Sequence, residues 1–440
     1  MKSLSKLITA KWLLSLGIFV CTLISCQKNG PGGVPYNPKE LHDDAEVATD
    51  WYKLQLRILL ERNSALNGVH FGYIGIGLYE SVRNGTNAPS LSTKLNKMPE
   101  MPAVEKNKFY NWQVSANAAM ASMVRSFYSG LTAADMTAID SLEKVYNDKL
   151  SLAMSSESFS RSQTFGRSIA TAIHDWYLTD DFNPSNAGYI PPVFPGAWVP
   201  TPPAFANGVM PYIGNARTFL ASDLTGIAPD HLPYSEDPNS DFYKMVKNVY
   251  DVSLTLTTDQ KNTALYWVDQ GNGVGYTPDG HNMAIVTQAI DQTRVGLYIA
   301  AETYAKAGIA ERDANIECFR SKYAYNLIRP VSYIQKLIDP AWLPFIVTPP
   351  FPEYPAAHAY VTGSVMQATA SVLGDHVRVT DNSYSFRGWA PRTYNTLFAV
   401  AEEAGISRLY GGIHYLPSIN TGLLLGKDLG NRIGDIRLHN

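Results

Sequence analysis

The sequence predicts an all-α protein. Apolar residues recur at helical spacing through most of the chain, and runs of alternating β-branched residues are scarce. Of the 440 residues, 45% are hydrophobic and 17% charged, which suits a sizeable core. The formal net charge of −3 leaves no broad positive field, so a nucleic-acid partner is not expected.

The periodicity predicts helices over the following ranges: 46–62, 68–83, 106–128, 133–151, 159–177, 241–254, 282–307, 310–328, 356–373, 394–410 and 418–433. Between Asp181 and Thr218 lies a long stretch rich in Pro, Gly and Asn. Because it also holds large aromatic side chains such as Trp198 and Phe219, we expect an ordered loop that packs across the helices. Residues 45–440 are therefore expected to form a single α-helical domain.

The first 25 residues have the features of a secretory signal peptide, with a basic start followed by an apolar run. The run ends in Leu23-Ile24-Ser25-Cys26, which resembles the bacterial lipobox. That resemblance implies lipidation of Cys26, a flexible tether over residues 26–44, and a lipid-anchored protein of the bacterial cell envelope that faces the periplasm or the exterior. No apolar run of about 18 residues follows, so the membrane is expected to be contacted only through this anchor.

Three cysteines are present. Cys21 would be removed with the signal peptide and Cys26 would carry lipid, which leaves Cys318 alone. A single thiol cannot form an intrachain disulfide or a cysteine metal site. Cys318 lies in an apolar helical pattern, so a buried, inert thiol is expected.

The first stretch with candidate chemistry is Lys322-Tyr-Ala-Tyr-Asn-Leu-Ile-Arg329-Pro330. Seven positions at about 100° each amount to nearly two turns, so both cations are expected on one side of a helix, about 10 Å apart. Pro330 is expected to stop that helix at Arg329. Two basic residues at this spacing are common on solvated faces, so the stretch is informative only together with the next two.

The second stretch is Glu353-Tyr354-Pro355-Ala356-Ala357-His358, which opens a helix that Gly374 follows. Proline is favoured in a first helical turn, so His358 is expected within the first turn or so. Free backbone N–H groups and the positive end of the helix dipole favour a bound anion there.

The third stretch is Ser407-Arg408-Leu-Tyr-Gly411-Gly412-Ile-His414. Arg408 and His414 can converge only if the helix breaks between them. Gly411-Gly412 provides such a break through left-handed backbone, and Pro417 is expected to begin another helix.

Together the three stretches resemble, in order and spacing, the three-part signature shared by vanadium-dependent haloperoxidases and the type 2 phosphatidic acid phosphatase (acid phosphatase) superfamily. The sequence around these stretches is similar to that of the soluble bacterial haloperoxidase-like branch. The resemblance implies a helical-bundle architecture, with two four-helix bundles. It also implies a vanadate cofactor whose oxygens would contact Lys322, Arg329, Arg408 and the Ala357 N–H, with His414 as the vanadium ligand and His358 as the acid/base.

Two positions depart from the family pattern. Ala356-Ala357 stands where the family usually has Ser-Gly, which removes a hydroxyl donor worth about 1–3 kcal/mol and predicts weaker vanadate retention. Ser418 stands where the family commonly has an Asp that orients the equivalent of His414. Either the activity is weak, since loss of such a partner typically costs about 10–100-fold, or another acid takes its place.

The function implied first is the oxidation of a halide by hydrogen peroxide, iodide or bromide rather than chloride, with transfer to a small organic acceptor. An alternative is an acid phosphatase that uses His414 as nucleophile and His358 as proton donor in the same pocket. A third is a catalytically impaired lipoprotein that only binds oxyanions. His281, in Pro278-Asp279-Gly280-His281, imitates the second motif superficially and is assigned to a loop near the site, with packing and supporting roles both open.

Overall fold

Helices dominate the fold in a computed structural model that describes residues 45–61, 68–223, 226–269 and 275–438. The predicted signal peptide, Cys26 and the tether over residues 26–44 lie outside the described residues. The α-helices are α2 (Glu46–Leu60), α3 (Gly68–Val82), α4 (Trp112–Phe127), α5 (Ala133–Ser151), α6 (Ser156–Tyr177), α7 (Asp241–Leu254), α8 (Thr258–Tyr266), α9 (Pro278–Thr293), α10 (Leu297–Tyr325), α11 (Pro330–Leu337), α12 (Ala357–Leu373), α13 (Leu397–Tyr410) and α14 (Leu416–Gly434). Short 3-10 helices cover Arg83–Gly85, Leu91–Thr93, Ile213–Asn215, Ala221–Asp223 and Ser385–Arg387, and the strands are β1 (Val379–Asp381) and β2 (Arg392–Tyr394).

Most helices begin where the sequence places a capping side chain. Thr132 and Asp135 form a capping box at the start of α5, and Thr257 and Gln260 form one at the start of α8. Single side-chain caps open α4, α6, α7, α9 and α13; they are Asn111, Ser155, Ser240, Thr277 and Thr396. Each cap satisfies an N–H group that the first turn leaves free, which typically stabilises a helix by about 1 kcal/mol.

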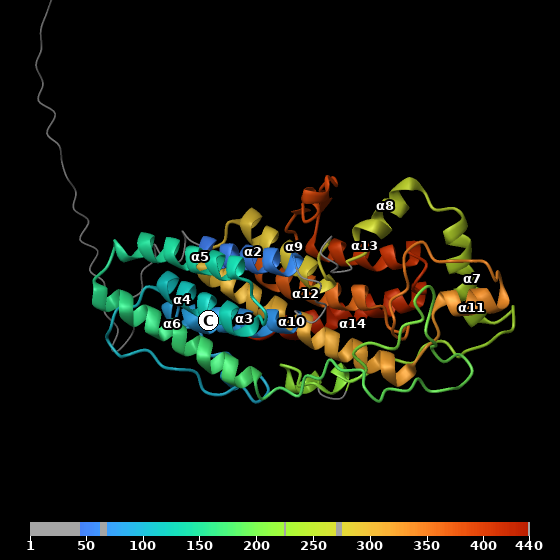
Figure 1. Cartoon of the computed structure of the whole chain (residues 1–440), viewed down its shortest axis with the longest axis horizontal. Helices are drawn as coiled ribbons and strands as arrows, with labels where there is room; N and C mark the ends of the chain where they lie inside the picture. Colours follow the sequence, from blue (N-terminus) through green and yellow to red (C-terminus); the bar gives the residue numbers. More distant parts are fainter. Residues whose placement is uncertain (1–44, 62–67, 224–225, 270–274, 439–440) are drawn as a thin grey trace, which may run out of the picture.

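The long helix α10 joins two groups of helices (Figure 1). In the first group it packs on α3, α3 packs on α4, and α4 packs on α6. In the second group it packs on α12, which also contacts α13 and α14. The largest cluster of buried apolar residues extends through both groups, from Val47 to Leu438. The predicted all-α helical-bundle fold is confirmed, and no helix within the described ranges is long and apolar enough to cross a membrane.

Glycines bring α12 and α14 close together. A Cβ atom on Gly426 would lie 2.5 Å from the carbonyl oxygen of Tyr360, and one on Gly422 would lie 2.8 Å from that of Ala356. Gly430 makes a similar approach to Ser364. Because these glycines recur every four residues, they form one face of α14. That face holds the first turn of α12, where His358 lies, against the start of α14.

The predicted interruption between the helices over 282–307 and 310–328 is wrong, because Gly308 lies inside α10. A Cβ atom there would lie 2.7 Å from the carbonyl oxygen of Phe71, so Gly308 serves the close packing of α10 on α3. The chain instead breaks at Arg294, which adopts left-handed backbone with φ 53° and caps α9. The helices predicted over 282–307 and 310–328 are therefore α9 and α10, and α8 and α11 were not predicted.

The segment from Asp181 to Thr218 is ordered against the helices, as predicted. Trp198 and, directly after the segment, Phe219 are fully buried, whereas Phe205 is largely exposed. The segment pairs with the residues after α10: the Trp198 N–H donates to the Asn326 carbonyl at 2.6 Å, and Ala197 forms a bridge with Leu327.

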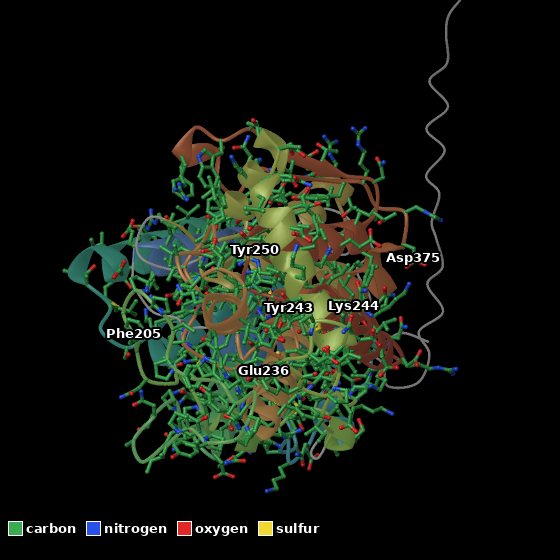
Figure 2. All side chains as sticks on the ribbon, turned by 90° about the vertical axis from the view of Figure 1, so that its right-hand side faces the viewer. Phe205, Glu236, Tyr243, Lys244, Tyr250 and Asp375 are labelled. Atoms are coloured by element: carbon green, nitrogen blue, oxygen red, sulfur yellow. The ribbon has the colours of Figure 1, made fainter. Side chains whose placement is uncertain are left out.

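The end of the molecule beyond α10 is covered by α7 and α11. Viewed from this end, α7 presents Tyr243, Lys244 and Tyr250 toward the viewer, with Glu236 nearby (Figure 2). Glu236 forms an exposed ion pair with Lys336 of α11 at 2.6 Å. The strands β1 and β2 pair antiparallel, and Asp381 at the end of β1 contacts His281 in the first turn of α9.

Candidate oxyanion-binding active site

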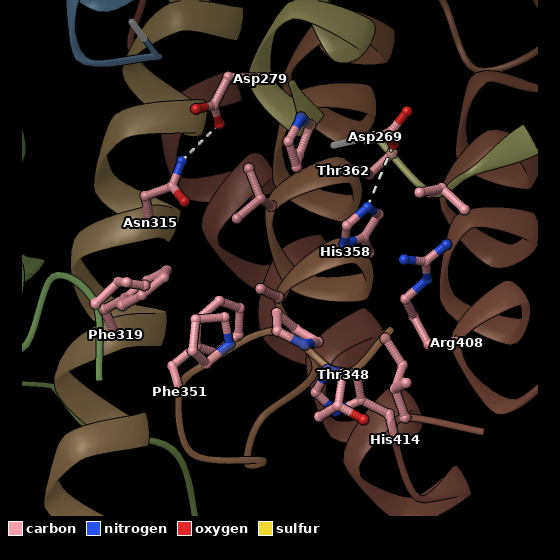
Figure 3. Close-up of a pocket in the computed structure, with 18 of the residues that line it drawn as sticks. Asp269, Asp279, Asn315, Phe319, Thr348, Phe351, His358, Thr362, Arg408 and His414 are labelled. Carbon is pink, nitrogen blue, oxygen red and sulfur yellow. Dashed lines mark hydrogen bonds and ion pairs between the residues drawn. The ribbon is translucent and has the colours of Figure 1, made fainter. Parts of the chain in front are cut away.

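The second and third predicted stretches contribute residues to one pocket of about 400 Å³, and Arg329 of the first stretch contacts His414 there. Ala357, His358, Arg408 and His414 line it directly, and Figure 3 shows the last three side chains on one side of the cavity. Lys322 and Arg329 are fully buried, with their charged ends 5.2 and 5.0 Å from the ring centre of Phe351, which also lines the pocket. The sequence therefore identified residues that the fold brings together.

Lys322 and Arg329 do not share one helix, contrary to the prediction. Lys322 lies in the last turn of α10, which ends because Asn326 adopts left-handed backbone with φ 47°. Arg329 is extended and immediately precedes α11, whose first residue is Pro330. Pro330 thus starts a helix rather than stopping one, as proline at a first helical position commonly does.

Lys322 is held by backbone carbonyls. Its Nζ donates to Glu353 at 2.8 Å and to Pro352 at 3.2 Å, and also to the Pro355 carbonyl. An ammonium group has three N–H donors, so binding an oxyanion would require it to exchange one of these bonds. Burial, together with the neighbouring Arg329 charge, lowers the pKa of Lys322 to about 8, while Cys318 and Glu353 oppose this shift.

Arg329 retains a free donor. Its Nε donates to the Phe351 carbonyl and its Nη1 to the Ile413 carbonyl, both at 2.8 Å. Its Nη2 is buried and has no hydrogen-bond partner among the described residues. A buried, unsatisfied guanidinium nitrogen is costly unless an acceptor binds it. This donor, together with the uncapped first turn of α12 after Ala356, fits a bound oxyanion such as vanadate or phosphate.

His414 is oriented by Glu353. Its Nδ1 lies 2.8 Å from Oε1 of Glu353, which also accepts the Tyr415 N–H at 3.0 Å. Nδ1 therefore carries the proton, and the lone pair of Nε2 faces Arg329 Nη1 at 3.1 Å. Burial, followed by the charges of Arg329 and Lys322, lowers the pKa of His414 well below its usual value, so the imidazole is neutral.

Glu353 thus fills the role that Ser418 leaves open. Burial raises the pKa of Glu353 to about 7, while the charges of Lys322 and Arg329 oppose that rise. Ser418 is itself buried on α14. An acid from another position therefore contacts His414, as one of the two alternatives required.

The turn between Arg408 and His414 has the predicted form. The helix α13 ends at Tyr410, and Gly412 adopts left-handed backbone with φ 76°. The Arg408 guanidinium donates from Nε to Ser407 Oγ at 3.0 Å and from Nη2 to the Trp267 carbonyl. Burial lowers the pKa of Arg408 to about 10, so it remains charged at neutral pH.

His358 lies in the first turn of α12, as predicted, and faces an acid from another part of the chain. Its Nε2 is 3.3 Å from Oδ2 of Asp269, a distance that makes an ion pair when the ring is protonated (Figure 3). Burial and the Arg408 charge lower the pKa of His358 to about 4, although Asp269 opposes this. The ring is therefore neutral at pH 7 and able to accept a proton.

Behind Asp269 lies a fully buried ionic network that sequence reasoning missed. His281 Nδ1 contacts Asp269 Oδ1 and its Nε2 contacts Asp381 Oδ2, both at 2.9 Å. The hydroxyl of Tyr384 donates to Asp269 at 2.6 Å. Burial alone would lower the pKa of His281, but the two carboxylates raise it to about 10. His281 is thus a charged residue in the first turn of α9, not a loop residue, and it supports Asp269.

Cys318 is buried, with its Sγ 3.8 Å from the Pro355 carbonyl. Burial raises the pKa of this thiol to about 11. The predicted burial of this thiol is therefore confirmed. Within the described ranges, no cluster of three or more His, Cys, Asp or Glu side chains could hold a metal cation.

Residues 336–437 match the family model of the VCPO second helical-bundle domain. The fold is similar to the crystal structure of the first bacterial vanadium-dependent iodoperoxidase, with 29% identity, 92% of this chain and 99% of that chain covered, and a TM-score of 0.81. The apo-type structure of a bacterial vanadium-dependent chloroperoxidase shares the fold at 15% identity, with 84% of this chain and 92% of that chain covered and a TM-score of 0.61. The holo-type structure shares it at 14% identity, with 91% of this chain and 93% of that chain covered and a TM-score of 0.58. No curated protein matches the chain.

The fold and the assembled pocket define a helical-bundle protein of the haloperoxidase type. The match of residues 336–437 to this family model and the fold shared with the bacterial iodoperoxidase support the resemblance to vanadium haloperoxidases that the three motifs predicted.

Proposed function

We propose that the protein is a vanadate-dependent haloperoxidase that oxidises iodide or bromide with hydrogen peroxide. The observation that carries the proposal is the arrangement around His414: a neutral imidazole whose Nδ1–H is fixed by Glu353 and whose Nε2 lone pair lies beside the buried cation Arg329. A metal-ligating histidine needs this protonation state and a carboxylate or carbonyl partner at its other nitrogen. The similar iodoperoxidase structure supports the choice of iodide.

Each group has a distinct role in this proposal. When bound, vanadate would supply the Lewis acidity that activates peroxide. Arg329 and Arg408 would neutralise its negative oxygens, joined by Lys322 after the exchange of one carbonyl bond, and the Ala357 N–H would donate to a further oxygen. His414 would hold the metal through Nε2 once this nitrogen exchanges its hydrogen bond from Arg329 Nη1 for the metal.

His358 would move the proton. Its neutral ring would accept a proton from incoming peroxide, and the Asp269 carboxylate would stabilise the imidazolium that forms. The same proton would then be returned to the departing oxygen.

Purified protein reconstituted with orthovanadate should oxidise iodide, and bromide more slowly, only when peroxide is present. Protein without vanadate, and the Arg329→Met variant with vanadate, are the controls and should show little turnover. Absence of vanadate-dependent iodide oxidation in folded protein that binds vanadate would refute the proposal.

An acid phosphatase is the second candidate, and the Glu353 contact favours it. A nucleophilic His414 would attack phosphorus through Nε2 while Glu353 holds Nδ1–H, so the absence of Asp at position 418 does not remove nucleophile activation. Release of phosphate from a generic phosphomonoester, inhibited by vanadate, would identify this activity. Neither activity in protein that still binds oxyanions would indicate a catalytically impaired binding protein.

We propose a location as well: a lipid anchor at Cys26 on the bacterial cell envelope, facing the periplasm or the exterior. The Leu23-Ile24-Ser25-Cys26 sequence supports it. Metabolic labelling with a fatty-acid probe should mark the wild type and not Cys26→Ser, and a labelled variant would contradict the anchor.

A further inference from the structure

The pocket extends well beyond the oxyanion end. Its volume of about 400 Å³ lies in the range of sites for small organic ligands and is larger than a single tetrahedral oxyanion requires. Its walls are largely apolar and include Phe319, Phe351, Ile346 and Val361. Apolar walls contribute little to binding peroxide or halide, but they would contact an apolar molecule.

A second polar cluster lies across this pocket from Arg408 and His414. Figure 3 shows Asp279 and Asn315 at the far side, separated from His414 by the cavity. Asp279 comes from the first turn of α9 and Asn315 from α10, and Asn315 Nδ2 donates to Asp279 Oδ1 at 2.9 Å. Asn282, one turn further along α9, also lines the pocket.

Asn282 has an unused acceptor. The residue is 1% exposed, and its Nδ2 donates to Glu311 Oε1 at 3.4 Å. Its Oδ1 is buried and has no hydrogen-bond partner among the described residues. Because a buried amide oxygen without a donor is costly, a ligand that brings an N–H or O–H group would be stabilised here.

The charges at this end favour a donor or a cation over an anion. Burial raises the pKa of Asp279 to about 6, with a contribution from Asp269, while the Asn315 hydrogen bond opposes it. Burial and the charge of Asp279 raise the pKa of Glu311 well above its usual value. An ammonium group would pair with the Asp279 carboxylate, whereas a second carboxylate would be repelled.

We propose that Asp279, Asn282 and Asn315 form a binding subsite for the amino group of a small apolar amine, whose hydrocarbon body lies in the pocket toward Phe319 and Phe351. Binding of the amine is inferred from the residues of the pocket and does not depend on the proposed oxidation of halide. Use of such a molecule as the organic acceptor of oxidised halogen would rest on the proposed haloperoxidase function.

Calorimetric titration of the purified protein without vanadate, near pH 7.5, tests the subsite. The probes are 2-phenylethylamine, 2-phenylethanol and phenylacetate, which share an apolar body and differ in the terminal group. The amine should bind most tightly and the alcohol less tightly. Phenylacetate should be displaced by orthovanadate, because its carboxylate is expected only at the cationic end.

Asp279→Asn should lower the affinity for the amine by about tenfold or more, because the charged hydrogen bond is lost. The affinity for the alcohol should change by less than about threefold. Asn282→Leu should weaken both. Asp428→Asn, an exposed substitution on α14, is the matched control and should change neither. Thermal unfolding of each variant identifies loss of fold, and Asn282→Leu supplies the test if Asp279→Asn does not fold.

Equal affinities for the three probes, or amine binding that survives both pocket substitutions in folded protein, would overturn the subsite. Undetectable binding of the amine would do the same. Because the titration needs no turnover, protein that binds the amine but oxidises no halide contradicts only the proposed function. Protein that oxidises iodide but binds no amine contradicts only the subsite.

Discussion

His414 Nδ1 lies 2.8 Å from Glu353 Oε1, and this contact joins the third stretch to the first residue of the second. It fixes the proton on Nδ1 and leaves Nε2 as the nitrogen that would bind vanadium or attack phosphorus in the proposed functions. Glu353 is fully buried, so its carboxylate is stabilised by the nearby charges of Lys322 and Arg329 rather than by water.

Glu353→Gln should weaken vanadate binding by about 10–100-fold, because the amide orients Nδ1 less strongly than a carboxylate does. Vanadate affinity measured by calorimetry tests this. Glu402→Gln, an exposed substitution on α13, should leave the affinity unchanged. Equal affinity of wild type and Glu353→Gln would show that this carboxylate does not set the state of His414.

Ala356→Ser should strengthen vanadate binding by restoring a hydroxyl beside the oxyanion, a gain of about 1–3 kcal/mol if the bond forms. The new hydroxyl could instead cap α12, which would raise stability without improving affinity. Affinity and thermal unfolding of the vanadate-free protein, measured side by side, separate these effects. Greater stability with unchanged affinity would contradict the expected contact.

His358→Ala should lower kcat for iodide oxidation by about 10²–10⁴-fold, the usual contribution of a positioned acid/base. Vanadate should still bind, because His414, Arg329 and Arg408 remain. Steady-state kinetics on protein saturated with vanadate provide the measurement. A kcat within about threefold of the wild type would remove His358 from the proton-transfer step.

His281→Gln should reduce stability in a pH-dependent way. The folded pKa of His281 is raised from 6.5 to about 10, so the native state binds more protons between these values. Its contribution is fully present below pH 6.5 and is lost as the pH rises through about 10. The contribution of Asp269 to stability depends on pH in the opposite direction. His281 and His358 hold the pKa of Asp269 below its usual value, against the effect of burial, so its contribution to stability is lost in acid.

The free energy of unfolding of the wild type should therefore exceed that of His281→Gln most clearly near pH 5–6, with the difference shrinking toward pH 10. Urea unfolding across this range measures it. His376→Gln changes an exposed histidine and should show no such trend. A difference that is constant with pH would mean that His281 contributes only packing.

Gly426→Ala should destabilise the fold by about 1–3 kcal/mol through overpacking. Alanine is the better helix former, but its Cβ atom would lie 2.5 Å from the Tyr360 carbonyl oxygen, which belongs to the backbone and cannot move aside cheaply. Thermal unfolding is the measurement. Gly226→Ala, where nothing lies within 4 Å of the new atom, is the control, and equal melting temperatures would contradict the close approach.

The sequence predicted the helical fold and the convergence of Lys322, Arg329, His358, Arg408 and His414 because short motifs encode local backbone geometry and residue type. It did not predict that Asn326 ends α10. That left-handed residue is held by pairing with Trp198, a contact between segments far apart in the chain. Helical periodicity contains no information about such a contact.

The supporting acids were missed for a related reason. Glu353 is 61 residues from His414 in sequence, and Asp381 is 100 residues from His281. Neither separation follows a local rule, so only the fold reveals which carboxylate serves which imidazole. Gly308 is the opposite case. Glycine commonly ends a helix, but here it lies inside α10 and allows the close packing of α10 on α3.

Helix α10 carries Asn315 and Lys322 on one uninterrupted rod. Their separation along its axis is set by the helical rise, about 10 Å for seven residues, and no side-chain movement can alter it. Asn315 lines the pocket, whereas Lys322 is buried outside its lining. Substitutions of the residues that line the pocket would therefore change its width without changing the spacing of these two positions along α10.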